Sequence, residues 1–173
     1  MHGLYEMNGP TNHSLVEIDL DNERGMLSSV PEKVGPRFET PAGGVLAAIR
    51  ASGSMNFRSN GVFASVLLAP IPDMESAFAS DRVQRFNAPV GTLVINPSNV
   101  DRMLRWSAPK QNAAIAIGRS TYAELAAAEL DGKDWELRPP KFGHVDLKAL
   151  RIATAIAEEI SSPAINTPYF APL

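Results

Sequence analysis

The chain has 173 residues, of which 45% are hydrophobic and 20% charged, a composition that fits one globular domain with its own core. Its apolar runs are short, so none predicts a transmembrane helix, and residues 1–10 lack the basic and apolar regions of a secretory signal. The absence of cysteine excludes disulfides, thiolate metal sites and a cysteine nucleophile. With a net charge of −3 and scattered basic residues, the chain alone is not expected to bind DNA. We expect a cytoplasmic protein with no membrane partner.

The N-terminal part, residues 1–43, mixes prolines with polar residues. Only residues 15–18 alternate apolar and polar side chains, which predicts an edge strand. The rest of this part is interpreted as loop that wraps the core.

From residue 44 to residue 118 the pattern indicates β-structure. Pro70 and Pro72 end one apolar run, since proline cannot continue a central strand, and Ser80-Asp81 predicts a hairpin turn. Several short strands at close spacing are typical of a sandwich or barrel. The expected strands cover residues 45–51, 62–69, 74–78, 82–86, 91–96, 102–106 and 112–117.

The period then changes from that of strands to that of helices. Thr121 and Glu124 have the spacing of a capping box, which predicts an N-cap at Ser120 or Thr121. The Ala-rich helix that follows is expected to end at Asp131-Gly132, where glycine can adopt a left-handed cap conformation.

A second helix is predicted to begin at the N-cap Asp146 and to end before Pro163. Its apolar residues recur at steps of three and four, which places them on one helical face. These residues are Leu147, Leu150, Ala153, Ile156, Ala157 and Ile160. We therefore expect a single domain with an N-terminal segment (1–43), a barrel (44–118), a helical segment (119–163) and a tail (164–173).

The order of these elements resembles the N-terminal sensor domain of AraC-family transcriptional regulators. The residues that carry the resemblance are Phe-Ala-Ser-Val-Leu-Leu-Ala at 63–69, Pro-Val-Gly-Thr-Leu-Val-Ile-Asn-Pro at 89–97, Arg102-x-x-x-Trp106 and the helix at 147–160. The match covers roughly the last two thirds of the chain. It implies a mainly-β fold: a cupin-like jelly-roll β-barrel followed by two C-terminal α-helices.

The resemblance also implies a function. Such sensor domains bind a small organic effector in the barrel and dimerise through their helices, and a helix-turn-helix part that binds DNA follows them. The 173 residues do not include this part, so the chain is expected to be a stand-alone sensor, a truncated reading frame or an expressed fragment. Tyr169-Phe170 stand where the family usually starts its next helix, which favours truncation.

The residues do not favour a metal site or an enzyme. A cupin metal site needs converging histidines and a carboxylate, but His2, His13 and His144 all lie outside the predicted barrel. After Pro97, where a later ligand would lie, the chain offers Asp101 and Arg102, and arginine does not bind metal. No nucleophile elbow, phosphate loop or dinucleotide motif occurs. We expect no catalytic residue, metal or cofactor, although a carboxylate-only metal site in a small cupin enzyme remains an alternative.

A pocket in the barrel remains, since a small barrel can hold one ligand. On strand 102–106, Arg102, Leu104 and Trp106 share one face, so Trp106 could form a wall and Arg102 could anchor an anionic group. Alternatively, these side chains only pack the core and Arg102 pairs with an acid. The expected ligand-binding residues are Trp106, Arg102, Phe63, Phe86 and Met55.

The apolar face of the second helix has two interpretations. It can pack only on the barrel, or part of it can form a dimer interface through Leu147, Leu150, Ile156 and Ile160. We expect a homodimer, because two-fold pairing is the commonest oligomer.

The predicted function is an effector-sensing and dimerisation domain of an AraC-type regulator. The alternatives are a small cupin enzyme and a purely structural dimerisation module with a filled barrel.

Overall fold

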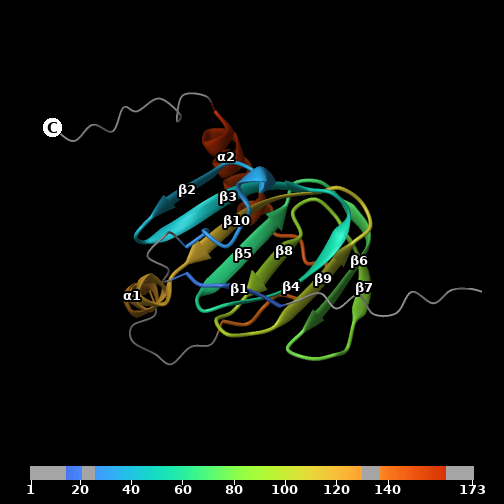
Figure 1. Cartoon of the computed structure of the whole chain (residues 1–173), viewed down its shortest axis with the longest axis horizontal. Coiled ribbons are helices and arrows are strands. Elements are labelled where there is room, and N and C mark those ends of the chain that lie inside the picture. The colour runs from blue at the N-terminus through green and yellow to red at the C-terminus, as the bar shows by residue number, and fades with distance from the viewer. Residues whose placement is uncertain (1–14, 21–25, 130–136, 163–173) are drawn as a thin grey trace, which may run out of the picture.

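Two five-stranded β-sheets face each other, and two helices follow them in the chain (Figure 1). The computed structural model describes residues 15–20, 26–129 and 137–162. The first sheet contains, in spatial order, β1 (Leu15–Ile18), β4 (Gly53–Ser59), β9 (Arg102–Trp106), β6 (Ile71–Phe78) and β7 (Gln84–Ala88). The second contains β2 (Arg37–Thr40), β3 (Gly43–Arg50), β10 (Lys110–Ile117), β5 (Val62–Leu67) and β8 (Leu93–Asn96).

The strand order is that of a jelly roll. Strands β3 to β10 form two antiparallel four-stranded sheets, β4-β9-β6-β7 and β3-β10-β5-β8, and most consecutive strands alternate between the two sheets. Strands β1 and β2 extend one edge of each sheet, β1 in parallel with β4. The predicted fold class, a mainly-β jelly-roll barrel followed by two C-terminal helices, is confirmed, as is the edge strand at residues 15–18.

Two strands were not predicted, and Pro72, unlike Pro70, was misinterpreted. Strand β4 begins at Gly53 and has only two apolar residues, Met55 and Phe57, which alternate with polar ones, and β2 is short with one apolar residue, Phe38. Strand β6 begins at Ile71 and contains Pro72. A bulge between Ile71 and Met74, with Asp73 at φ 50°, interrupts the pairing with β7 and accommodates the proline.

The core lies between the sheets and continues into the N-terminal part of the chain. Inward side chains of both sheets, such as Leu46, Leu67 and Leu104, are almost fully buried. The segment before β2, which includes the short 3-10 helix η1 (Glu32–Val34), is more than a loop around the core, because it contributes apolar side chains to it. These are Leu20, Met26, Leu27, Val30 and Val34.

The first helix begins earlier than predicted. Helix α1 covers Arg119–Glu129, so Ser120 and Thr121 lie inside its first turn and neither is the N-cap. The amide of Tyr122 already donates to the carbonyl of Gly118, which starts the helical hydrogen bonding there. Asp131-Gly132 lie outside the described residues.

The N-cap of the second helix is confirmed. The carboxylate of Asp146 accepts hydrogen bonds from the amides of Lys148 and Ala149, both at 2.9 Å, and helix α2 covers Leu147–Ser161. Pro163 and residues 164–173 lie outside the described part of the chain.

Helix α2 covers the outer face of the second sheet (Figure 1). Ala153 of α2 packs against Val66 of β5 and Ala113 of β10 in a small apolar cluster, which its neighbours Leu68, Leu93, Ala149, Leu150 and Ala157 complete. Neither described helix is long and apolar enough to cross a membrane.

Candidate ligand-binding cavity

A cavity of about 270 Å³ lies between the two sheets. Strands β3, β5, β8 and β10 of the second sheet line one side of it, and β1, β4, β6 and β9 of the first sheet line the other. An engineered cavity of about 150 Å³ holds benzene, so this one has room for a larger molecule. The alternation of the strands places these side chains inside, since every second residue faces the other sheet.

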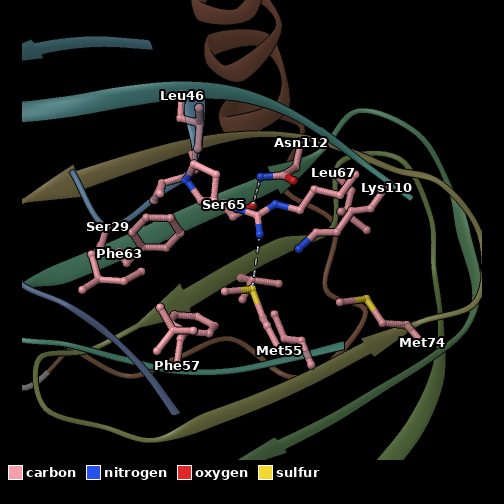
Figure 2. A pocket seen from close by; sticks show the side chains of 18 residues that line it. Ser29, Leu46, Met55, Phe57, Phe63, Ser65, Leu67, Met74, Lys110 and Asn112 are labelled. Carbon is pink, nitrogen blue, oxygen red and sulfur yellow. Dashed lines mark hydrogen bonds between the residues drawn. The ribbon is translucent and has the colours of Figure 1, made fainter. Parts of the chain in front are cut away.

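Most of the cavity wall is apolar. The rings of Phe57 and Phe63 meet edge to face, with centroids 5.9 Å apart and an interplanar angle of 68°. Figure 2 shows both rings near Ser29, on the side opposite to Lys110 and Met74. Ser29, Val16 and Pro31 are the exposed residues of the lining, so the cavity reaches the surface beside them.

Two basic side chains line the cavity, and they lie next to each other. Lys110 begins β10 and Arg50 ends β3, and the two are directly opposite in the antiparallel pairing. Lys110 is only 6% exposed and Arg50 is half-buried. The Arg50 guanidinium donates to the sulfur of Met55 at 3.9 Å, a weak acceptor (Figure 2).

The charge of Lys110 is poorly compensated. Its ammonium group lies 4.8 Å from the centroid of the Trp106 ring, an attractive cation–π arrangement. None of the described residues that line the cavity carries a carboxylate. Burial, followed by repulsion from Arg50 and Arg102, lowers the pKa of Lys110 from 10.5 to about 7.

Asn112 and Ser65 add neutral polar groups to the same wall. The Asn112 side-chain amide donates to the Ser65 hydroxyl at 2.9 Å, as Figure 2 shows. The Asn112 side-chain oxygen is buried and accepts no hydrogen bond from a described residue. The cavity therefore combines apolar walls with a cluster of polar groups, an arrangement typical of ligand pockets.

Only two of the five residues expected to bind ligand line the cavity. Met55 of β4 and Phe63 of β5 lie in its wall, whereas Arg102, Trp106 and Phe86 do not. Arg102, Leu104 and Trp106 do share the inward face of β9, as the alternation predicts, but only Leu104 reaches the cavity.

Arg102 is buried away from the cavity and does not pair with an acid in the described structure. Its guanidinium donates to the Ile95 carbonyl at 3.0 Å and to the Ser76 hydroxyl at 3.4 Å. It also stacks over the rings of Phe78 and Phe142. Arg102 therefore lies outside the lining of this cavity, and the expectation that it pairs with an acid is wrong for the described part of the chain.

Trp106 and Phe86 have structural roles. The indole N–H of Trp106 donates to the Ala51 carbonyl at 2.6 Å, which fixes the ring in the core. Phe86 stacks on Phe142, with centroids 5.2 Å apart. Neither ring is a wall of the cavity.

The sequence pattern did not point to Lys110, Arg50 or Asn112. The predicted last strand began at Asn112, two residues late, and Arg50 lay inside the predicted strand 45–51 without being singled out. The alternation of this strand does contain the signal. Because every second residue of a strand has the same orientation, Lys110, Asn112 and Ala114 share the inward face.

The residues predicted for dimerisation differ in exposure. Leu150 packs on the second sheet, Leu147 is 69% exposed, and Ile156 and Ile160 are half-buried. His144 lies in the loop before α2, and His2 and His13 are outside the described residues. In the described part of the chain, His, Asp and Glu side chains do not gather in groups of three or more that could hold a metal ion.

No protein-family model and no curated protein matches the chain. Among solved structures it is similar to an RmlC-like cupin family protein of Methanocaldococcus jannaschii, with 16% identity, a TM-score of 0.42 and coverage of 53% of this chain and 84% of the other. A putative mannose-6-phosphate isomerase of Ralstonia eutropha matches with 11% identity, a TM-score of 0.41 and coverage of 49% and 82%. A cupin superfamily protein of Desulfitobacterium hafniense matches with 10% identity, a TM-score of 0.39 and coverage of 56% and 93%. These likenesses are distant and cover about half of the chain.

Proposed function

We propose that the chain is a non-catalytic sensing domain that binds one small organic molecule in the cavity between its sheets. The observation that carries this proposal is the cavity itself, about 270 Å³ with mostly apolar walls and a polar cluster. A purely structural barrel gains nothing from such a space, because an unfilled cavity forfeits packing. Ligand binding gives the cavity a use.

The proposal includes the regulatory role that the sequence resemblance implies. In this role the chain is the effector-binding half of an AraC-type regulator, and a separate domain binds DNA. The arrangement of α2 supports a path for the signal, since the strands that line the cavity with one face carry α2 on the other.

A chain of hydrogen bonds also joins the cavity wall to α2. The carbonyl of Leu67, a lining residue, accepts from the amide of Gly91 at 2.8 Å, and the carbonyl of Gly91 accepts from the amide of Asp146 at 3.1 Å. Gly91 has a φ of 84°, which other residues rarely adopt. A ligand that moves β5 would thus bias the position of the N-cap of α2.

A homodimer through α2 is part of the same proposal. The exposed apolar side chain of Leu147, at 69%, supports it, since it gains burial in a two-fold pair. Light scattering should give the mass of a dimer for the wild type and of a monomer for Leu147→Asp. A monomeric wild type would contradict the dimer.

A thermal-shift screen tests ligand binding. Organic acids, aromatics and sugars are screened with and without divalent metals against the wild type, Ala114→Leu and Ala128→Leu. Ala114 lies in the cavity wall, so leucine there fills the cavity, whereas Ala128 is exposed on α1. A ligand bound only by the folded state raises the unfolding midpoint.

We expect an organic ligand to raise the midpoint of the wild type and Ala128→Leu but not of Ala114→Leu. A shift that requires metal would support the enzyme instead. A shift that survives Ala114→Leu would place the ligand elsewhere, and no shift at all would favour a structural module.

A further inference from the structure

The two basic side chains of the cavity lie where their charges oppose each other. Lys110 and Arg50 are directly paired across β10 and β3, with both side chains in the cavity wall. Like charges directly opposite on neighbouring strands destabilise a sheet. The repulsion is reflected in Lys110, whose pKa is lowered by burial first and by Arg50 second.

No acidic group relieves this repulsion in the described structure. The ion pairs of Glu75 with Arg85 and Arg105, and of Asp101 with Arg58, involve residues outside the cavity lining. Arg50 on β3 lies opposite Lys110, and the Trp106 ring on β9 lies against its ammonium group. Arg102 of β9, outside the lining, adds further repulsion, and none of these groups is negative. A buried cation without a counter-charge is costly, so the cavity favours a negative group beside Lys110.

We propose that the ligand of this cavity is an organic anion, an apolar molecule whose carboxylate is held between Lys110 and Arg50. This inference rests on the proposed function and adds the chemical class of the ligand. The carboxylate would accept charge-assisted hydrogen bonds from both side chains. The apolar body would lie along Phe57 and Phe63, toward the opening at Ser29.

The apolar walls separate this ligand from an inorganic anion. Phosphate could meet the two cations but would leave the aromatic part of the cavity unfilled. An alcohol of the same chain length would fill the apolar part but would leave the cations uncompensated. The carboxylate satisfies both parts of the cavity.

Calorimetry with matched ligands tests the inference. Butyrate, hexanoate, octanoate and benzoate are compared with the corresponding alcohols and with inorganic phosphate. The proteins are the wild type, Lys110→Met, Arg50→Met and the control Lys148→Met, which removes an exposed lysine at the start of α2. Circular dichroism confirms that each variant is folded.

We expect at least one carboxylate to bind more tightly than its alcohol and more tightly than phosphate. Lys110→Met and Arg50→Met should each weaken the affinity for the carboxylate by about ten- to hundredfold, and Lys148→Met should leave this affinity unchanged.

Binding of the carboxylate should also take up protons near neutral pH, because the anion favours the charged form of Lys110. Measurements in two buffers with different ionisation enthalpies detect this uptake, which Lys110→Met should abolish.

The outcomes separate this inference from the proposed function. If alcohols bind as tightly as carboxylates, and Lys110→Met changes neither affinity, the cavity binds a ligand but the inference that the ligand is an anion is wrong. If phosphate binds as tightly as the best carboxylate, the inference that the ligand has an apolar body is wrong. If no member of either series binds, the inference fails, and the thermal-shift screen, which also contains sugars and other aromatics, decides separately whether the proposed function fails.

Discussion

Replacing Lys110 with methionine should stabilise the protein without ligand, and the gain should depend on pH. In the folded state the pKa of Lys110 is about 7, against 10.5 for an ordinary lysine, chiefly because the side chain is buried. Below pH 7 both states hold the proton, and the folded state carries the full cost of the buried charge. Between the folded-state pKa of about 7 and the unfolded-state pKa of 10.5, the unfolded state holds more protons, so rising pH stabilises the fold. Above 10.5 Lys110 is neutral in both states, and the cost of its buried charge has disappeared.

The size of the effect follows from the same two values. The interval between 10.5 and about 7, at about 1.36 kcal/mol per pH unit, corresponds to about 5 kcal/mol of destabilisation at acid pH. Methionine keeps an unbranched side chain that is one atom shorter, and it removes the charge. The gain from Lys110→Met should therefore be several kcal/mol at about pH 6 and smaller by about 3 kcal/mol at about pH 9.

Urea unfolding of the wild type and Lys110→Met at both pH values measures the gain, with Lys148→Met as the control for a lost surface charge. The control should show no pH-dependent gain, because Lys148 is exposed. A gain from Lys110→Met that does not change with pH, or a loss of stability at acid pH, would refute the argument that Lys110 is a buried, uncompensated cation.

Two further substitutions test particular contacts. Asp146→Ala removes the N-cap of α2 and should cost about 1 kcal/mol in urea unfolding, whereas Asp146→Asn should cost less; equal losses would contradict the cap. Trp106→Phe removes the hydrogen bond to the Ala51 carbonyl and should cost about 2 kcal/mol, with a smaller effect on ligand affinity than Lys110→Met because Trp106 lies outside the cavity lining. A loss of ligand affinity larger than that of Lys110→Met would indicate that Trp106 belongs to the binding site.

The fold could be predicted from the sequence where local signals are strong. Alternation and turn residues placed most of the barrel strands, and the Asp146 cap placed the start of α2. Strand β4 was missed because only Met55 and Phe57 carry its alternation, and the glycine and serines beside them are typical of a loop. The bulge at Asp73 allowed a proline that a regular strand would exclude.

The site was harder to predict, because alternation gives the face of a residue but not its place along the barrel. Arg102 and Trp106 do face inward, yet Arg102 meets Phe78 and Phe142 and Trp106 meets Ala51. The pair of Lys110 and Arg50 arises only from the register of β10 with β3, two segments far apart in the sequence. No local pattern carries that register.

A crystal structure grown with ω-bromo-octanoate tests the central claim most directly, since the anomalous signal of bromine locates the apolar end of the ligand. We predict bromine beside Phe57 and Phe63 and the carboxylate within hydrogen-bond distance of Lys110 and Arg50. A cavity that stays empty, or a ligand bound only at the outer surface, would contradict the account.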